Sequence, residues 1–183
     1  MEAVPFGACG NRFIKISTGM NKILYVFVAF FMLQMGAFAQ TNFEELTLAK
    51  ALEKAKAENK LVFVDTYTSW CMPCKYMANT IFPKSEMGEY LNPRFVCVKY
   101  NTEEGEGAEI MKRYEISAFP TFLILNTKGE VQHRIVGGSE TAEDFIKRVA
   151  EGLDEDKAIG ILAVKYEKGD RDVKLLVKYA RAL

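Results

Sequence analysis

Two cysteines three residues apart, Cys71 and Cys74, constrain this chain more than any other feature. The run before them, Leu61–Tyr67, is apolar and rich in β-branched residues, so it predicts a buried strand. The run after them, residues 75–79, contains good helix formers, and no helix breaker follows before Pro83. The pair therefore lies where a strand leads into the N-terminus of a helix. There, free N–H groups and the helix dipole stabilise a thiolate, the reactive form of cysteine.

The composition narrows the possible classes of protein. The chain has 183 residues, of which 49% are hydrophobic, which suits one globular domain with a sizeable core. Lysine plus arginine equal aspartate plus glutamate at 24 each. The chain therefore has no excess of positive charge that would suggest nucleic acid as a partner. A zinc half-site is an alternative for the cysteine pair, but beyond residue 39 only Cys97 and His133 remain to complete four ligands. We therefore expect neither a metal nor a cofactor.

The N-terminal residues predict a targeting segment rather than a part of the fold. Residues 23–39 are apolar, a lysine precedes them, and they end in Ala37-Phe38-Ala39. A basic start, an apolar centre and a small-residue end are typical of a secretory signal peptide, with cleavage expected after Ala39. The alternative is an uncleaved membrane anchor, although so short a stretch is at the lower limit for a spanning helix. Whether the natural start is Met1 or Met20 stays open.

We accordingly expect three parts: an N-terminal extension with the signal peptide at residues 1–39, a folded domain at 40–152 and a C-terminal extension at 153–183. The protein would be exported to the periplasm, and it would contact a membrane only if the signal segment stays uncleaved. Disulfides persist in such an oxidising compartment. A bridge between Cys71 and Cys74 closes a very short loop and constrains the unfolded chain little. A working redox couple therefore explains this pair better than a structural staple does.

Two further residues have simpler expected roles. Cys97 lies among apolar neighbours in a predicted strand, so we expect a small buried hydrophobe rather than a third redox thiol. His133 is expected at the surface of a strand.

Predicted helices and strands alternate through the folded domain. Asn42, with Glu45 three residues on, predicts an N-capped helix that runs to Asn59. Pro83 should end or kink the helix that follows the cysteines, and Ser85 can cap a shorter one. The remaining elements are strands at about 60–66, 94–100, 121–125 and 131–136, and helices at about 107–115 and 141–152. This order predicts an α/β three-layer fold, with a mixed central sheet covered by helices.

The residues beyond Gly152 predict two more helices. Acidic residues at 154–156 suggest a helix start, and apolar residues recur at helical spacing as far as Tyr166. After a turn at 168–170, a second apolar face runs from Asp172 to Leu183. Two helices joined by a short turn form a helical hairpin, which cannot bury its own apolar face. It should dock on the folded domain, bind a partner or begin a longer array.

Several separated features resemble the thioredoxin superfamily over residues 43–152. In chain order they are the buried acid Asp65, Trp70 with Cys71-Met72-Pro73-Cys74-Lys75, the strand lysine Lys99, the cis-proline segment Phe119-Pro120-Thr121, and Gly137 after the last strand. The run Lys60–Asp65, the break at Phe82-Pro83 and the strand Phe95–Asn101 look closest to exported thioredoxin-like proteins. These include the C-terminal domain of transmembrane disulfide-interchange reductases. Met72 stands where thioredoxin has glycine, at the position that tunes the redox potential.

The resemblance and thiol chemistry together imply catalytic roles. Cys71, nearer the surface, is the expected nucleophile, and Cys74 resolves the mixed disulfide. Asp65, buried in an apolar setting, would accept a proton from Cys74, although a helix-capping role is the alternative. Lys99 would modulate that acid, unless it is a solvated edge residue.

Substrate binding is implied for three residues. Pro120, in the cis form, would present the backbone of Phe119 to a substrate chain. Trp70 would serve as an apolar platform beside the reactive sulfur and also as a core residue.

The predicted function is that of an exported thiol–disulfide oxidoreductase, a reductase or isomerase rather than an oxidase. Its substrates would be protein disulfides, and its electrons would come from a membrane-bound donor. The alternative is a partner-binding module, in which the fold and the helical hairpin form an interaction surface and the cysteines are structural.

Overall fold

The computed structural model of the protein describes residues 40–154 and 157–182. The predicted signal peptide and its cleavage site at residues 1–39 lie outside the described residues. None of the helices in the described ranges is long and apolar enough to cross a bilayer.

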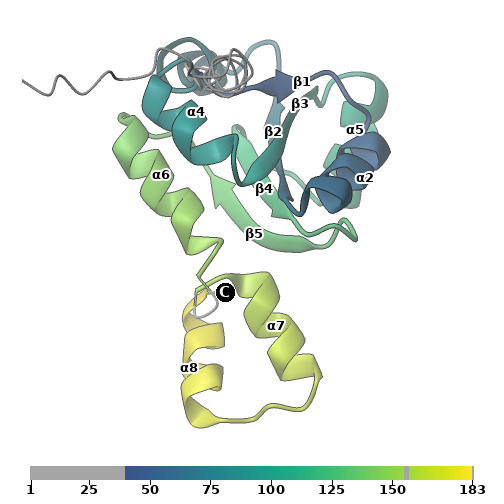
Figure 1. Cartoon of the computed structure of the whole chain (residues 1–183), viewed down its shortest axis with the longest axis vertical. Coiled ribbons are helices and arrows are strands. Elements are labelled where there is room, and N and C mark those ends of the chain that lie inside the picture. Colours follow the sequence, from purple (N-terminus) through teal and green to yellow (C-terminus); the bar gives the residue numbers. More distant parts are fainter. Residues whose placement is uncertain (1–39, 155–156, 183) are drawn as a thin grey trace, which may run out of the picture. The chain divides into compact units, whose positions relative to one another are not determined.

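Five strands form one mixed sheet in the order β1-β3-β2-β4-β5 (Figure 1). Strands β1 and β2 pair with β3 in parallel, whereas β4 is antiparallel to both β2 and β5. The mixed sheet and its terminal hairpin confirm the prediction. The strands are β1 (Phe43–Glu44), β2 (Leu61–Tyr67), β3 (Phe95–Asn101), β4 (Thr121–Leu125) and β5 (Val131–Val136).

Helices cover both faces of the sheet and so complete the predicted three layers. Figure 1 shows α2 and α5 on one side and α4 and α6 on the other. The described helices are α2 (Leu48–Glu58), α3 (Met72–Tyr76), the π-helix η1 (Met77–Ile81), α4 (Ser85–Leu91), α5 (Gly105–Arg113), α6 (Ala142–Glu151), α7 (Ile159–Glu167) and α8 (Val173–Ala182).

The central strand β2 divides the core because successive side chains of a strand point to opposite faces. Val62 and Val64 join the cluster beneath α2 and α5. Phe63 joins the other cluster, beneath η1, α4 and α6, where its ring lies 5.7 Å from that of Phe122. Asp65, two residues further along the strand, shares the face of Phe63. Asp65 is therefore an acid on a face rich in aromatic rings, and this apolar setting affects the pKa of its carboxyl.

The predicted start of the first helix is wrong. Asn42 does not cap a helix; its N–H donates to the Asn92 side chain at 2.9 Å, and strand β1 follows. Phe43 pairs with Cys97 and packs its ring against that of Phe82, 5.0 Å away between centroids. The helix starts later, with Thr47 as its N-cap. Pairing and aromatic packing therefore outweigh a local capping pattern at this point.

The helix that follows the cysteines ends near Pro83, as predicted, but its last turn is a π-helix, which was not predicted. Helix α3 continues as the π-helix η1, and the Phe82 N–H donates to the Met77 carbonyl at 2.9 Å. Ser85 is the first residue of α4 rather than its cap, because Lys84 occupies the N-cap without a side-chain hydrogen bond. Thr141 does cap α6, where its hydroxyl accepts from the Asp144 N–H.

The C-terminal helical hairpin is present, and α7 packs on β5. Gly160 lies so close to the backbone of Val131 and Gln132 that a side chain would not fit there. Helix α8 packs against α7, with the Tyr166 and Tyr179 rings 5.6 Å apart. Helix α7 begins at Ile159 after the N-cap Ala158, so the predicted helix start at Asp154 is wrong; residues 155 and 156 of that prediction lie outside the described residues.

Candidate active site

The Cys71–Cys74 pair forms a disulfide at the start of α3, with its Cα atoms 5.3 Å apart. Cys71 is the N-cap residue, and its Sγ accepts the Cys74 N–H at 3.1 Å. Pro73 suits the first turn because it has no N–H to leave unpaired. In the reduced protein the same N–H would favour a thiolate on Cys71 over a thiol.

Exposure does not distinguish the two cysteines. Cys71 is 3% exposed and Cys74 is 6% exposed, so the prediction that Cys71 lies nearer the surface is wrong. The side chains of Trp70 and Met72, at 66% and 69% exposure, stand on either side of Cys71 in the sequence. The position of Cys71 at the helix N-terminus, rather than its exposure, is what sets it apart.

Asp65 is buried toward the end of β2, and its Oδ1 has no hydrogen-bond partner. Burial raises the pKa of this carboxyl from 3.8 to about 7, and the charge of Lys99 opposes that rise. No hydrogen bond joins Asp65 to the start of α3, where Cys71 is the cap, so the capping alternative is not observed. A carboxyl with such a pKa exchanges protons near neutral pH.

Lys99 lies opposite Asp65 in the register of β2 and β3, with its side chain exposed. Both residues line a cavity of about 270 Å³, whose other walls come from residues 40–43, Ala78 on η1 and Phe82-Pro83. The cavity gives the region of Asp65 a connection toward solvent at Lys99. Lys99 is solvated, although β3 lies between β1 and β2 rather than at the edge of the sheet. Its role as a modulator of the acid stays a prediction.

The peptide bond between Phe119 and Pro120 is cis, as the resemblance implied. The Phe119 ring meets the Trp70 ring edge to face, with centroids 6.0 Å apart. Trp70 is largely exposed, so the prediction that it is also a core residue is wrong. Together the two rings and the cis-proline form an apolar surface beside the disulfide.

Glu103, in the turn after β3, is a residue of this site that the sequence patterns did not indicate. Its carboxylate accepts the Ser69 N–H at 2.6 Å and so holds the loop that carries Trp70. The pKa of Glu103 is lowered by this bond from the Ser69 backbone, with further help from the Ser69 and Trp70 side chains. An acid two residues beyond the end of β3 was the available sequence signal.

Cys97 and His133 stand apart from this chemistry. Cys97 is a free thiol at 1% exposure, and burial raises its pKa to about 12, which confirms the prediction of a buried hydrophobe. His133 is half-buried rather than at the surface, and burial lowers its pKa. In the described ranges, no group of three or more His, Cys, Asp or Glu side chains could hold a metal ion.

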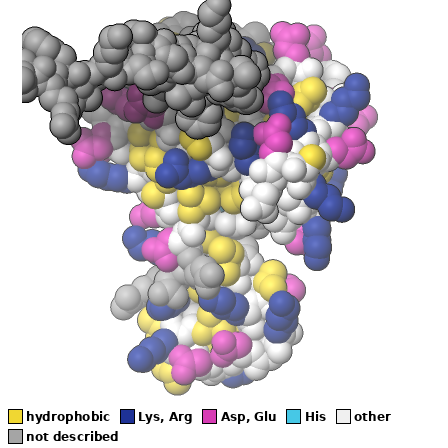
Figure 2. Space-filling model, viewed as in Figure 1, with side chains coloured by type: hydrophobic (Ala, Val, Ile, Leu, Met, Phe, Trp, Pro, Cys, Tyr) yellow, Lys and Arg dark blue, Asp and Glu magenta, His cyan; other side chains and the backbone are white. Residues whose placement is uncertain are grey.

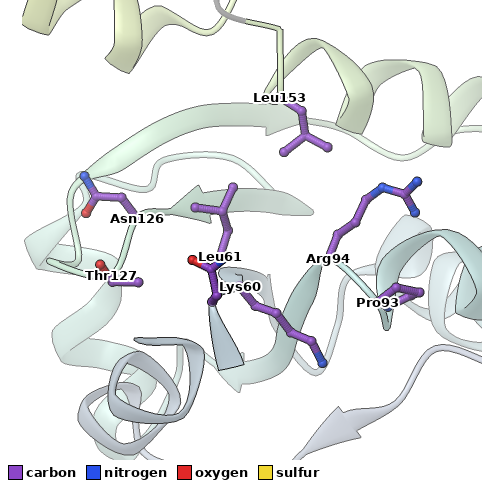
Figure 3. Close-up of a pocket in the computed structure, with 8 residues that line it drawn as sticks. Lys60, Leu61, Pro93, Arg94, Asn126, Thr127 and Leu153 are labelled. Atoms are coloured by element: carbon purple, nitrogen blue, oxygen red, sulfur yellow. The ribbon is translucent and has the colours of Figure 1, made fainter. Parts of the chain in front are cut away.

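A second pocket, of about 450 Å³, lies at the opposite end of β2 from the cysteines. Figure 3 shows Leu61 and Leu153 directed into it from opposite sides. Its two cations already have partners: Lys60 pairs with Glu58 at 2.8 Å, and Arg94 donates to the Tyr90 carbonyl at 2.8 Å. No cysteine lines this pocket, so it takes no part in thiol chemistry.

The surface shown in Figure 2 carries both signs of charge. Lysine and arginine side chains are interspersed with aspartate and glutamate over this face rather than gathered in one basic patch. This face therefore lacks the kind of surface that binds a phosphate backbone.

A three-layer fold with a cysteine pair at the start of a helix, a buried acid on β2 and a cis-proline before β4 defines a thiol–disulfide oxidoreductase. The family comparison agrees, since the model of the thioredoxin-like domain matches residues 48–152. The chain belongs to the thioredoxin-like family.

Individual relatives refine this placement. The chain is 32% identical over 122 residues to chloroplastic thioredoxin Y of Oryza sativa, a match that covers 67% of this chain and 68% of that protein. It is 29% identical over 103 residues to the thiol:disulfide interchange protein DsbD of Pseudomonas fluorescens, covering 55% of this chain but only 18% of that protein. Among solved structures, a candidate disulphide-isomerase from Bacteroides thetaiotaomicron is 41% identical with a TM-score of 0.57, covering 63% of this chain and 95% of the other.

Proposed function

We propose that this thiol–disulfide oxidoreductase is an exported protein that acts as a reductase or isomerase on protein disulfides. The observation that carries the proposal is the Cys71 Sγ at the N-cap of α3, where it accepts the Cys74 N–H at 3.1 Å. That geometry favours Cys71 as the attacking thiolate. The relatives named as thioredoxins and as a candidate disulphide-isomerase support the direction.

The proposed reaction begins with the reduced pair. The Cys71 thiolate attacks one sulfur of the substrate disulfide, which forms a mixed disulfide and releases the other substrate sulfur as a thiolate. Cys74 then attacks the Cys71 sulfur, forming the Cys71–Cys74 disulfide and releasing the second substrate sulfur. Two electrons pass from the cysteine pair to the substrate, and two protons end on the substrate thiols.

Asp65 takes the proton of Cys74 in the second step of this proposal. Its pKa of about 7 lets a fraction of the carboxyls ionise at neutral pH, so the group accepts a proton and later returns it to solvent. Lys99 favours the ionised form by its charge. The apolar surface of Trp70, Phe119 and Pro120 binds the substrate chain around its disulfide.

The electrons for the next cycle come, in this proposal, from a dithiol of a membrane-bound donor. Such a donor reduces the Cys71–Cys74 disulfide and is itself oxidised to a disulfide, so the electron count balances.

The proposal divides the chain into three parts: a signal segment at 1–39 that is cleaved after Ala39, the redox domain at 40–152 and the helical extension at 153–183. N-terminal sequencing of the exported protein should begin at Gln40; a retained N-terminus would favour the anchor instead.

The direct test is insulin reduction with dithiothreitol, comparing the protein with its Cys71→Ser variant. The wild type should accelerate turbidity and the variant should not. Equal curves would remove the catalytic proposal and leave a partner-binding module. A Cys74→Ser variant should accumulate substrates as mixed disulfides on Cys71, and accumulation on no partner would contradict the proposed order of attack.

The direction is tested by equilibrating the pair in glutathione buffers. A reductase should have a potential toward that of thioredoxin, about −270 mV, whereas strong oxidants lie near about −120 mV. A value at the oxidising end would overturn the reductase or isomerase assignment but not the thiol chemistry.

A further inference from the structure

Residues 136–140, which are the last residue of β5 and the loop that leads to α6, contact the candidate site at three points. The Gly137 N–H donates to the Pro120 carbonyl at 2.8 Å. The Ser139 N–H reaches the Met77 sulfur at 3.4 Å, and the Tyr76 hydroxyl donates to the Glu140 carbonyl at 3.1 Å. The loop therefore touches both the cis-proline segment and the helix that begins at the cysteines.

A single side chain on α6, Arg148, holds this loop from the other side. Its Nη1 donates to the carbonyls of Gly137 and Gly138 at 3.1 and 2.8 Å and to the Ser139 hydroxyl at 3.2 Å. Its Nη2 donates to the Val136 carbonyl at 2.6 Å. Four neutral acceptors from four consecutive residues thus converge on one half-buried guanidinium.

Two peptide groups connect Arg148 to the candidate site. A trans peptide directs its C=O and its N–H to opposite sides. The peptide between Val136 and Gly137 gives its C=O to Arg148 and its N–H to Pro120. The peptide between Gly138 and Ser139 gives its C=O to Arg148 and its N–H to Met77.

The loop needs such an anchor because of its residues. Gly137 has a φ of +83°, and two adjacent glycines give the unanchored backbone a wide range of conformations. A Cβ atom at Gly138 would lie 3.2 Å from the Met77 sulfur, so a larger residue there would press on that side chain. Val136 is an exposed apolar residue that pairs with Thr121, directly after the cis-proline.

We propose that Arg148 is a positioning residue for substrate binding, which fixes the Val136–Ser139 loop against Pro120 and Met77. This inference rests on the proposed function. Without the guanidinium, the loop would have to be ordered at each binding event, and that cost would appear in KM. Lysine cannot replace arginine fully, because an ammonium lacks the planar fork that reaches several acceptors.

The test measures insulin reduction by the full chain as kcat and KM for Arg148→Met, Arg148→Lys and a matched control, Lys147→Met. Lys147 precedes Arg148 on α6, is 65% exposed and pairs only with residues of its own helix turn. We expect KM to rise about tenfold in Arg148→Met, less in Arg148→Lys and not at all in Lys147→Met, with kcat changed less than about twofold.

Two readouts separate positioning from a general structural role. Reduced variants should react with 5,5′-dithiobis(2-nitrobenzoic acid), a small disulfide, at the wild-type rate, and the potential in glutathione buffers should not change. If Arg148→Met is active and its KM for insulin is unchanged, the role of Arg148 is refuted while the proposed function stands. The same holds if insulin reduction and the reaction with the small disulfide fall in parallel. Should Arg148→Met fail to fold, Arg148→Lys decides by the same criteria. A wild type without insulin reduction would instead overturn the proposed function and this inference with it.

Discussion

Two acids of the candidate site, Asp65 and Glu103, have the same functional group and opposite environments. Asp65 lies on the aromatic face of the sheet with an unpartnered oxygen, and burial raises its pKa to about 7. Glu103 lies in solvent, accepts the Ser69 N–H at 2.6 Å and has a lowered pKa. One carboxyl is therefore poised to exchange protons, and the other is a fixed anion that holds the Trp70 loop.

The comparison shows that desolvation and hydrogen bonding, rather than residue type, assign the roles of acids in this site. The same difference predicts that the two acids change the stability of the fold with pH in opposite directions. A raised folded-state pKa makes stability fall as pH rises between the unfolded and folded pKa values, whereas a lowered pKa makes stability fall as pH drops.

The largest expected effect is a gain of stability in Asp65→Asn. Ionising the wild-type acid costs more in the folded state because its pKa rises from 3.8 to about 7. The variant should therefore be more stable above pH 7 by up to about 4 kcal/mol, and the difference should fade toward pH 4. Urea unfolding of the disulfide form across this pH range measures it. The matched control Glu103→Gln should show no gain in the free energy of unfolding. If Asp65→Asn has the same free energy of unfolding as the wild type at every pH, the raised pKa of Asp65 is refuted.

The next effect is kinetic and concerns the second thiol step. Reduced protein mixed with 5,5′-dithiobis(2-nitrobenzoic acid) releases one thionitrobenzoate on attack by Cys71 and a second on resolution by Cys74. Without the base, Asp65→Asn should slow the second release about 100-fold at pH 7 and leave the first unchanged. In the wild type the second rate should rise with pH through about 7. Glu103→Gln should follow the wild type, and a slowed first step instead would contradict the assigned proton acceptor.

A smaller shift is expected from Lys99→Met. The Lys99 charge lowers the pKa of Asp65, so its removal should move the midpoint of the Asp65 titration upward. Since Lys99 is exposed, solvent screening limits the change to a fraction of a unit. Carboxyl ¹³C NMR measures the midpoint of the Asp65 titration. The control is Lys75→Met, which also removes one positive charge but next to Cys74 rather than opposite Asp65. A downward shift, or equal shifts in the two variants, would refute the pairing.

The smallest effect should come from Glu103→Gln, which keeps an acceptor oxygen but loses the charge. Trp70 is the single tryptophan of the chain, so its fluorescence reports directly on the loop. We expect acrylamide quenching to rise by less than about twofold, because an exposed contact of this kind is weak. The Asp65 midpoint should stay unchanged, and a shift of that midpoint would show that the two acids are not independent.

Much of the fold followed from local patterns. The apolar runs at Leu61–Tyr67 and Thr121–Leu125 are strands, and the cysteine pair begins a helix, because periodicity and helix-start residues act over a few positions. The first helix was misplaced because β1 is only two residues long and is held by pairing with Cys97, which lies far along the chain. The helix that follows Ala158 was also set too early, since Asp154 forms a turn there.

The candidate site divides in the same way. The cysteine pair could be predicted from its spacing and its place between a strand and a helix. The buried acid Asp65 and the cis-proline Pro120 were implied by the resemblance to the thioredoxin superfamily. The contact of Glu103 with Ser69, 34 residues away, and that of Arg148 with the loop at Gly137 arise from tertiary packing. The reason is physical: a side chain's partner and the pKa of a carboxyl depend on which distant backbone and which apolar surface surround it, and those are set only when the layers pack.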